Sequence, residues 1–292
     1  MVVVAQPGDS LSSLATQYLG SPADAWQIAE LNATSDLRPG QDVIIPLRAR
    51  NPGGVSDNGY QTVPILCYHR FGAIPSKLTL TASTFEAQMD YLARNGYRVI
   101  ALRQMLGFLA GNEPLPPKSV VITIDDGYRS TYEIAYPILK KYRFPATLFL
   151  YTDFAGARDA VSWPQMQEMQ RSGLIDIQSH SNAHSNLAVR TRSESQSQYE
   201  GRVRREVEVP KRRLAEYLGA EPFAFAYPYG DVNASVIEQM ARENEKLGLT
   251  VTPGGNAFFA PPFMLRRTMV FGHDDLNDFR SKVQVFTPLR GS

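Results

Sequence analysis

Residues 119–128 read SVVITIDDGY, an apolar run that ends abruptly in two acidic residues and a glycine. A near-continuous apolar run is typical of a strand buried inside a parallel sheet. Parallel sheets gather functional groups at the carboxyl ends of their strands, so Asp125 and Asp126 are candidate functional residues. Taken alone, the motif is also compatible with a structural role, in which one aspartate caps a helix and the other is exposed. The metal-binding strand of a nucleotide hydrolase is disfavoured, because the chain lacks Gly-x-x-x-x-Gly-Lys-Ser/Thr.

Similar apolar runs alternate with helical patterns after residue 60, which predicts a mainly parallel α/β sheet covered by helices. The expected strands are residues 63–69, 97–100, 119–124, 146–150, 174–180, 223–228, 248–252 and 267–271. The expected helices are residues 83–96, 130–142, 164–173, 193–218 and 235–244. About seven strands suit a distorted (β/α) barrel.

A second polar motif, SHSNAH, begins at the end of the expected strand at residues 174–180. His180 and His184 are four residues apart, which brings two imidazoles within about 5–6 Å on a tight turn. Satisfied surface histidines are the alternative, although half of the chain's 4 histidines lie here. Two imidazoles and one carboxylate form the ligand set of a catalytic zinc-type site. The remaining carboxylate can then act as the base in amide or ester hydrolysis.

The segments TIDDG, SHSNAH and FAYPYG resemble the successive motifs of the NodB-type polysaccharide deacetylases, carbohydrate esterase family 4. The resemblance covers about residues 60 to 285, and PILCYHRF, ATLFL and SWPQMQEM are similar to the poly-N-acetylglucosamine deacetylase branch. It implies a NodB-type barrel that deacetylates N-acetylglucosamine residues of a polysaccharide and releases acetate. It also implies Asp125 as general base, Asp126, His180 and His184 as metal ligands, the Tyr229 backbone N–H as oxyanion donor, and Pro228 and Gly230 as the turn around it.

The chain departs from the family pattern at the arginine that orients the catalytic aspartate. An arginine that pairs with the catalytic Asp is common in the family, but Ala226 and Tyr227 stand there, so Arg267 is the expected substitute. Alternation along a strand sends Arg266 and Arg267 to opposite faces, so only one can point inward.

For the general acid, the candidates are His69, which ends the expected strand at residues 63–69, and His273, which ends the alternating run at residues 269–273. His69 is preferred, because residues 274–279 look like the start of a terminal helix that would carry His273 away. Tyr128, Trp163 and Tyr229 are expected to stack on sugar rings, with a core role as the alternative.

Residues 1–48 form a separate small unit with an expected strand–helix–helix–strand order. QPGDSLSSLATQYLG and LNATSDLRPGQDVIIP closely resemble the LysM domain, which implies binding of N-acetylglucosamine chains by loops near residues 8–11 and 32–38. Residues 49–60, rich in Gly and Pro at first and then polar, are expected to be a flexible linker, and residues 61–292 the catalytic domain.

The balance of basic and acidic residues indicates which classes of binding partner the chain favours. With 30 basic and 29 acidic residues the formal charge is +1, which favours no nucleic acid or acidic lipid and suits a neutral glycan or peptidoglycan. There is no apolar run of about 18 residues to span a membrane, and MVVVA does not resemble a signal peptide. The single cysteine, Cys67, is expected to be a buried thiol.

The resemblance implies a location outside the cytoplasm, and we expect a monomer. One divalent metal is expected, zinc first, with Co²⁺, Ni²⁺, Mn²⁺ or Fe²⁺ as alternatives. A glycan-binding protein with an inactive deacetylase domain is the rival from another functional class. A third possibility is deacylation of a small molecule or of a peptidoglycan amide.

Overall fold

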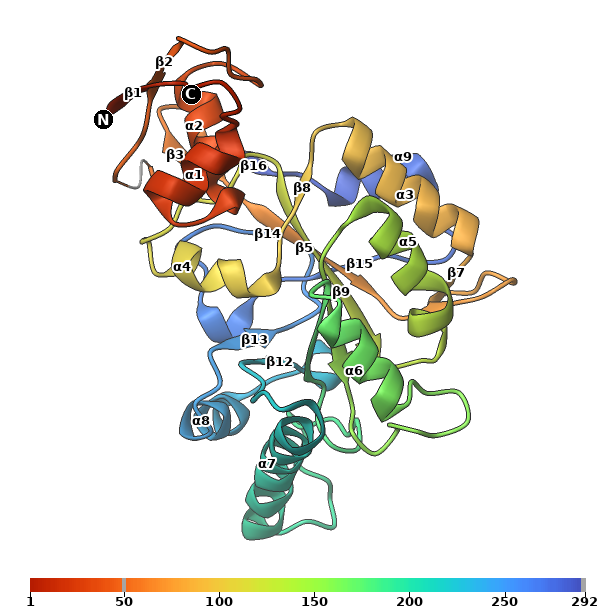
Figure 1. Ribbon diagram of the computed structural model, residues 1–292. Helices are drawn as coiled ribbons and strands as arrows, with labels where there is room; N and C mark the ends of the chain where they lie inside the picture. The colour runs from red at the N-terminus through yellow and green to blue at the C-terminus, as the bar shows by residue number, and fades with distance from the viewer. Residues whose placement is uncertain (49–50, 290–292) are drawn as a thin grey trace.

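The computed structural model describes residues 1–48 and 51–289 (Figure 1). The first unit consists of β1 (Val2–Val4), α1 (Leu11–Leu19), the 3₁₀ helix η1 (Pro22–Asp24), α2 (Ala25–Leu31) and β2 (Asp42–Ile44). Strands β1 and β2 pair antiparallel, and a small apolar core that includes Leu14, Ile28 and Val43 lies under the helices. The Ser10 side chain accepts the Ser13 N–H and begins α1, and left-handed Gly20 ends it. The expected strand–helix–helix–strand order is confirmed.

A curled sheet lies at the centre of the second unit. Its order is β13 (Leu247–Leu249), β12 (Ala224–Ala226), β11 (Ile175–Ser179), β10 (Ala146–Leu150), β9 (Ser119–Asp126), β5 (Val63–Tyr68) and β14 (Gly255–Asn256), with β15 (Thr268–Met269) on β5 and β8 (Arg98–Val99) on β9. Every pair is parallel except β14 with β5. All of the expected strands are present, and β14 is the two-residue addition.

The segment ahead of β15 links the two ends of the curl. Leu265 forms a parallel bridge with Leu249 of β13, and three residues later Thr268 pairs with Leu66 of β5. The sheet therefore closes on itself as the expected distorted barrel. Arg267 lies within this closing segment and is fully buried.

Helices cover the outside of the curled sheet. They are α3 (Ala82–Arg94), α4 (Met105–Leu109), α5 (Tyr136–Tyr142), α6 (Trp163–Arg171), α7 (Gln196–Leu218), α8 (Ala234–Arg242) and α9 (Leu276–Lys282), with short turns η2 (Leu102–Gln104), η3 (Thr131–Ala135), η4 (Pro228–Gly230) and η5 (Pro262–Met264). Figure 1 shows α3, α5 and α9 together on one side, while α7 and α8 lie side by side elsewhere. The five expected helices are confirmed. Among the described helices none is both long and apolar enough to cross a bilayer.

Part of the expected linker is ordered. Residues 49 and 50 lie outside the described residues, but β3 (Val55–Ser56) and β4 (Gly59–Gln61) form a hairpin that pairs with β16 (Phe286–Pro288). The prediction of a flexible connector is wrong for this stretch. A Cβ on Gly59 would lie 2.4 Å from the Thr287 carbonyl oxygen, so glycine here permits close strand approach. A further short pair is β6 (Arg70–Phe71) with β7 (Thr79–Leu80).

Candidate active site

The motifs TIDDG and SHSNAH lie close together because their strands, β9 and β11, flank β10. Leu150 at the end of β10 is paired with Asp126 of β9 on one side and with Ser179 of β11 on the other. The chain after Ser179 therefore delivers His180 to the level of the aspartates. His180 and Asp125 are almost completely buried.

Asp126 has a left-handed backbone, with φ at 75°. Regular strand alternation would send the neighbouring side chains of Asp125 and Asp126 to opposite faces. With this turn, Asp125 Oδ2 and Asp126 Oδ1 each lie 3.7 Å from His180 Nε2. A left-handed conformation is uncommon for residues other than glycine, although Asp tolerates it better than most.

The two histidines present their Nε2 atoms to Asp126. His180 Nδ1 lies 2.7 Å from the Ala226 carbonyl oxygen, so it donates there and leaves the Nε2 lone pair free. His184 Nε2 lies 3.5 Å from Asp126 Oδ1. Burial lowers the pKa of His180 to about 3 and also lowers the pKa of His184, so both rings are neutral at physiological pH.

These three residues fit a metal ion. The ligand atoms of Asp126, His180 and His184 all lie within 4.8 Å of one another. Neutral imidazoles with free Nε2 atoms and one carboxylate are the donors that a catalytic zinc-type site uses. Oxygen and nitrogen donors of this kind are compatible with several divalent metals.

Asp125 is paired with a cation on its other side. Arg267 Nη1 donates to Asp125 Oδ1 at 2.6 Å, while Arg267 Nε donates to the Thr250 carbonyl at 3.0 Å. Burial raises the pKa of Asp125, but Arg267, then His180 and His69, lower it, and the net shift is below the ordinary aspartate value. Arg266, by contrast, is exposed and bonds to the Pro253 carbonyl. Asp125 therefore stays ionised at physiological pH.

The two candidate general acids lie in different places. His69 Nδ1 is buried without a hydrogen-bond partner among the described residues, and the ligand atoms of His69 and Asp125 lie within 4.8 Å. His273 is exposed and stacks on Phe271, with 5.5 Å between ring centroids. Among contacts of the described part of the chain, none joins His273 to the aspartates.

The expected sugar-stacking residues also separate. Tyr229 is 61% exposed, and its ring lies 4.9 Å from that of His184, while Tyr128 contacts Phe154 and Arg70 near Asp126. Trp163 instead stacks on Tyr217 between α6 and α7, with 4.3 Å between centroids. In the described chain no contact brings Trp163 to the acid–histidine cluster.

The turn Pro228–Gly230 contains two successive residues with a left-handed backbone conformation. Pro228 is buried, and Tyr229 and Gly230 both have positive φ, 63° and 78°. A Cβ on Gly230 would lie 2.7 Å from the Val251 backbone nitrogen, so a side chain is excluded. The turn holds Tyr229 beside His184.

Sequence reasoning missed two features of the site. Tyr151 follows β10 and lies 5.3 Å from the His184 ring, between ring centroids. Its position after a strand is the signal that could have identified it. Buried Glu206, within α7, accepts the backbone N–H groups of Asn182 and Ala183 at 3.0 and 2.9 Å. No local pattern distinguishes it from the other acidic residues of that helix.

Two family profiles match the chain, and curated proteins resemble it in sequence. The polysaccharide deacetylase family profile matches residues 112–251, and the LysM domain profile matches residues 3–46. YxkH of Bacillus subtilis, whose name assigns it provisionally to the polysaccharide deacetylases, is 30% identical over 208 residues, covering 71% of each chain. The poly-beta-1,6-N-acetyl-D-glucosamine N-deacetylase of Staphylococcus aureus is 27% identical over 197 residues, 64% of this chain and 68% of that protein.

Solved structures share the fold over most of the second unit. The deacetylase PplD of Streptococcus pyogenes, in complex with acetate, has a TM-score of 0.70 at 26% identity, covering 77% of this chain and 99% of that one. IcaB of Ammonifex degensii has a TM-score of 0.69 at 27% identity, covering 77% and 97%. The chain therefore belongs to the polysaccharide deacetylase family and carries a LysM domain at its N-terminal end.

Proposed function

We propose that this chain hydrolyses the acetamido groups of an N-acetylglucosamine polysaccharide and releases acetate. The observation that carries the proposal is the division of labour between neighbouring aspartates. Asp125 is held by Arg267, while Asp126 faces His180 and His184. One cluster thus contains a fixed carboxylate base and a three-residue metal ligand set.

In the proposed reaction each group has one task. Asp126, His180 and His184 hold one divalent metal, zinc first, which when bound supplies Lewis acidity for the acetamido carbonyl and for water. Ionised Asp125 takes a proton from the attacking water, and Arg267 keeps it ionised and fixed. The Tyr229 backbone N–H donates to the developing oxyanion, and His69 gives a proton to the leaving amine nitrogen.

For the substrate we propose a β-1,6-linked N-acetylglucosamine polymer first, with chitin-like glycans and peptidoglycan as alternatives. The Staphylococcus aureus relative is named for the β-1,6-linked polymer. Residues 9–12 and 33–37 of the LysM domain line one hollow of about 860 Å³, together with Trp26 and with Arg98 and Pro116 of the second unit. Tyr128, Tyr229 and Tyr151 offer aromatic faces beside the metal ligands, whereas the packing of Trp163 on Tyr217 argues for a core role.

The test combines chemistry with metal analysis. The purified protein is expected to contain about one equivalent of divalent metal and to release acetate from β-1,6-linked oligomers faster than from chitin oligomers or peptidoglycan. Metal without acetate release on any glycan would instead support the rival, a glycan-binding protein with an inactive deacetylase domain.

We further propose residues 1–48 as the glycan-binding module and residues 61–292 as the catalytic domain, acting as a monomer outside the cytoplasm. Removing residues 1–50 is expected to leave turnover on short oligomers nearly unchanged and to weaken action on insoluble polymer, because the polymer is no longer held nearby. Acetate release on both substrates measures this. An equal fall on both would mean that the first unit belongs to the catalytic fold.

A further inference from the structure

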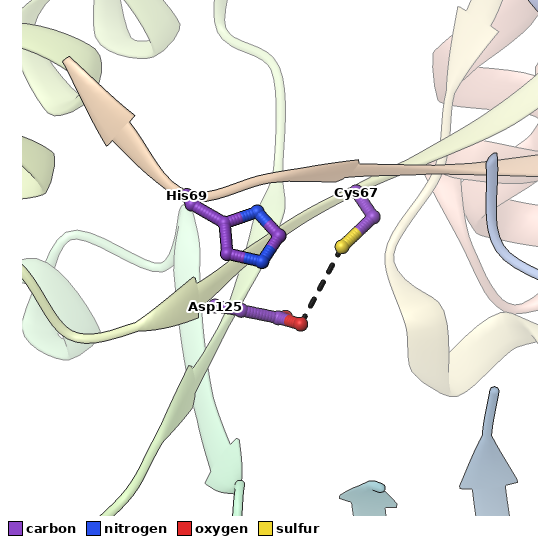
Figure 2. Close-up of side chains that lie close together, drawn as sticks. All are labelled: Cys67, His69 and Asp125. Carbon is purple, nitrogen blue, oxygen red and sulfur yellow. Dashed lines mark hydrogen bonds between the residues drawn. The ribbon is translucent and has the colours of Figure 1, made fainter. Parts of the chain in front are cut away.

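A second cluster of metal-ligating atoms lies beside Asp125 Oδ2, the carboxylate oxygen that does not accept from Arg267. Figure 2 shows Cys67, His69 and Asp125 with their side chains directed toward one another. Their ligand atoms all lie within 4.8 Å of one another, and the Cys67 thiol donates to Asp125 Oδ2 at 3.4 Å. None of these three residues belongs to the set of Asp126, His180 and His184.

The strand geometry explains this convergence. Cys67 of β5 is paired with Thr123 of β9 in parallel register. His69 and Asp125 each lie two residues further along, so they face the same side as Cys67 and Thr123. The three donors therefore come from a rigid pair of adjacent strands, and a ligand set on such elements needs little rearrangement to bind.

Two of the three groups have a donor atom that makes only a long hydrogen bond or none. Asp125 Oδ1 is used by Arg267, but Oδ2 points toward Cys67. His69 offers one ring nitrogen to the cluster, and separately its Nδ1 is buried with no hydrogen-bond partner in the described chain. A buried polar atom without a partner is uncommon and calls for a ligand or a chemical task.

We propose that Cys67, His69 and Asp125 form a second metal site, which takes soft divalent cations such as Cd²⁺ and Zn²⁺ and inhibits the enzyme when filled. A thiolate, an imidazole and a carboxylate favour soft or borderline ions over hard ones. Binding releases the thiol proton to solvent and forms the metal–sulfur bond. The inhibitory effect rests on the proposed function, because the ion occupies Asp125 and His69, the groups assigned to proton transfer.

The neighbourhood makes this site weaker than the first. The Arg267 guanidinium lies beside it and repels a second cation, and burial raises the pKa of the Cys67 thiol, whose proton must be displaced. Occupation therefore needs metal beyond the first equivalent. The enzyme is expected to be active with one equivalent and to lose activity as soft metal rises further.

The experiment titrates Cd²⁺ into holoenzyme that already holds one metal equivalent, in thiol-free buffer, with Mn²⁺ as the matched hard ion. Cys67 is the only cysteine of the chain, so any cadmium–thiolate charge-transfer absorbance reports this site. We expect that absorbance to rise with the second equivalent as acetate release falls, and Mn²⁺ to do neither. Cys67→Ser retains a donor toward Asp125, keeps its activity, and binds the second Cd²⁺ about tenfold or more weakly.

The outcomes separate the two proposals. Absorbance in the wild type that is absent in Cys67→Ser, with a parallel shift in inhibition, supports the second site. Equal inhibition of both proteins, or absorbance without inhibition, overturns it. Cys67→Ala serves if the serine variant does not fold. The absorbance does not depend on turnover, so a protein that releases no acetate at any metal level contradicts the proposed function and leaves the binding result readable.

Discussion

Asp125 and Asp126 are neighbours on one strand end, yet their surroundings give them opposite properties. Asp125 is paired with a fully buried arginine at 2.6 Å, and its pKa lies below the ordinary value. Asp126 faces the imidazoles of His180 and His184. Burial raises the pKa of Asp126 to about 6, with His69 acting to lower it and the charge of Asp125 acting to raise it. The two carboxylates differ in pKa because their surroundings differ, although they are neighbours in the sequence. One is a fixed anion, and the other would be stabilised in its charged form by the proposed metal ion.

The largest effect is expected from removing an imidazole beside Asp126. His180→Ala or His184→Ala leaves two of three ligands, so metal content and acetate release should both fall to background. Metal analysis after dialysis and an acetate assay measure this. His273→Ala is the matched control, because His273 is exposed and is expected to keep metal, activity and a near-normal pH profile. Full metal occupancy in both His180→Ala and His184→Ala would contradict the ligand assignment.

The next largest effect is expected from removing the cation that is paired with Asp125. Arg267→Met removes one partner of a buried ion pair, which typically costs about 3–5 kcal/mol of stability. Without the guanidinium, the pKa of Asp125 rises, so the acid limb of the kcat/KM profile should move to higher pH.

Thermal unfolding and the pH profile measure these effects of Arg267→Met, with exposed Arg266→Met as the control and Arg267→Lys where folding fails. In the wild type the lowered pKa of Asp125 means that the pair stabilises the fold at neutral pH and loses this contribution only as pH falls into the acid range. An unmoved acid limb in Arg267→Met or Arg267→Lys would separate Arg267 from Asp125.

The smallest effect is expected from the support behind the histidine loop. Glu206→Gln keeps the shape of the side chain but weakens its bonds to the Asn182 and Ala183 N–H groups, which hold the chain between the two histidines. Loss of such outer contacts commonly lowers metal affinity about 10–100-fold. A chelator competition assay measures the affinity, with Glu208→Gln on the same helix as the control. Equal affinity in both variants would mean that Glu206 supports only the helix packing.

Much of this arrangement could be predicted from local sequence. The strand ends carry their polar residues as expected, because apolar runs in buried parallel strands are long and end sharply. Alternation predicts that only one of Arg266 and Arg267 points inward, and the structure buries Arg267 and exposes Arg266. Strands of two or three residues, such as β14 and the hairpin β3–β4, are too short to show a period, and their pairing with β5 and β16 depends on distant chain segments.

The missing site features have a similar cause. Glu206 acts through a fold that brings α7 against the loop at residues 182–184, and no spacing along the chain reports this contact. Trp163 was a candidate for sugar stacking on residue type alone, and in the structure its ring packs on Tyr217. Residue type and spacing identify the ligands, but tertiary packing decides which neighbours support them.

The most direct measurement compares metal content and acetate release in Asp125→Asn and Asp126→Asn, purified side by side. Asp125→Asn is predicted to keep about one metal equivalent while turnover falls at least about 10²-fold through loss of the base. Asp126→Asn is predicted to lose the metal and the activity together. If Asp125→Asn loses its metal while Asp126→Asn retains it, the roles of the two aspartates are reversed and the central claim is contradicted.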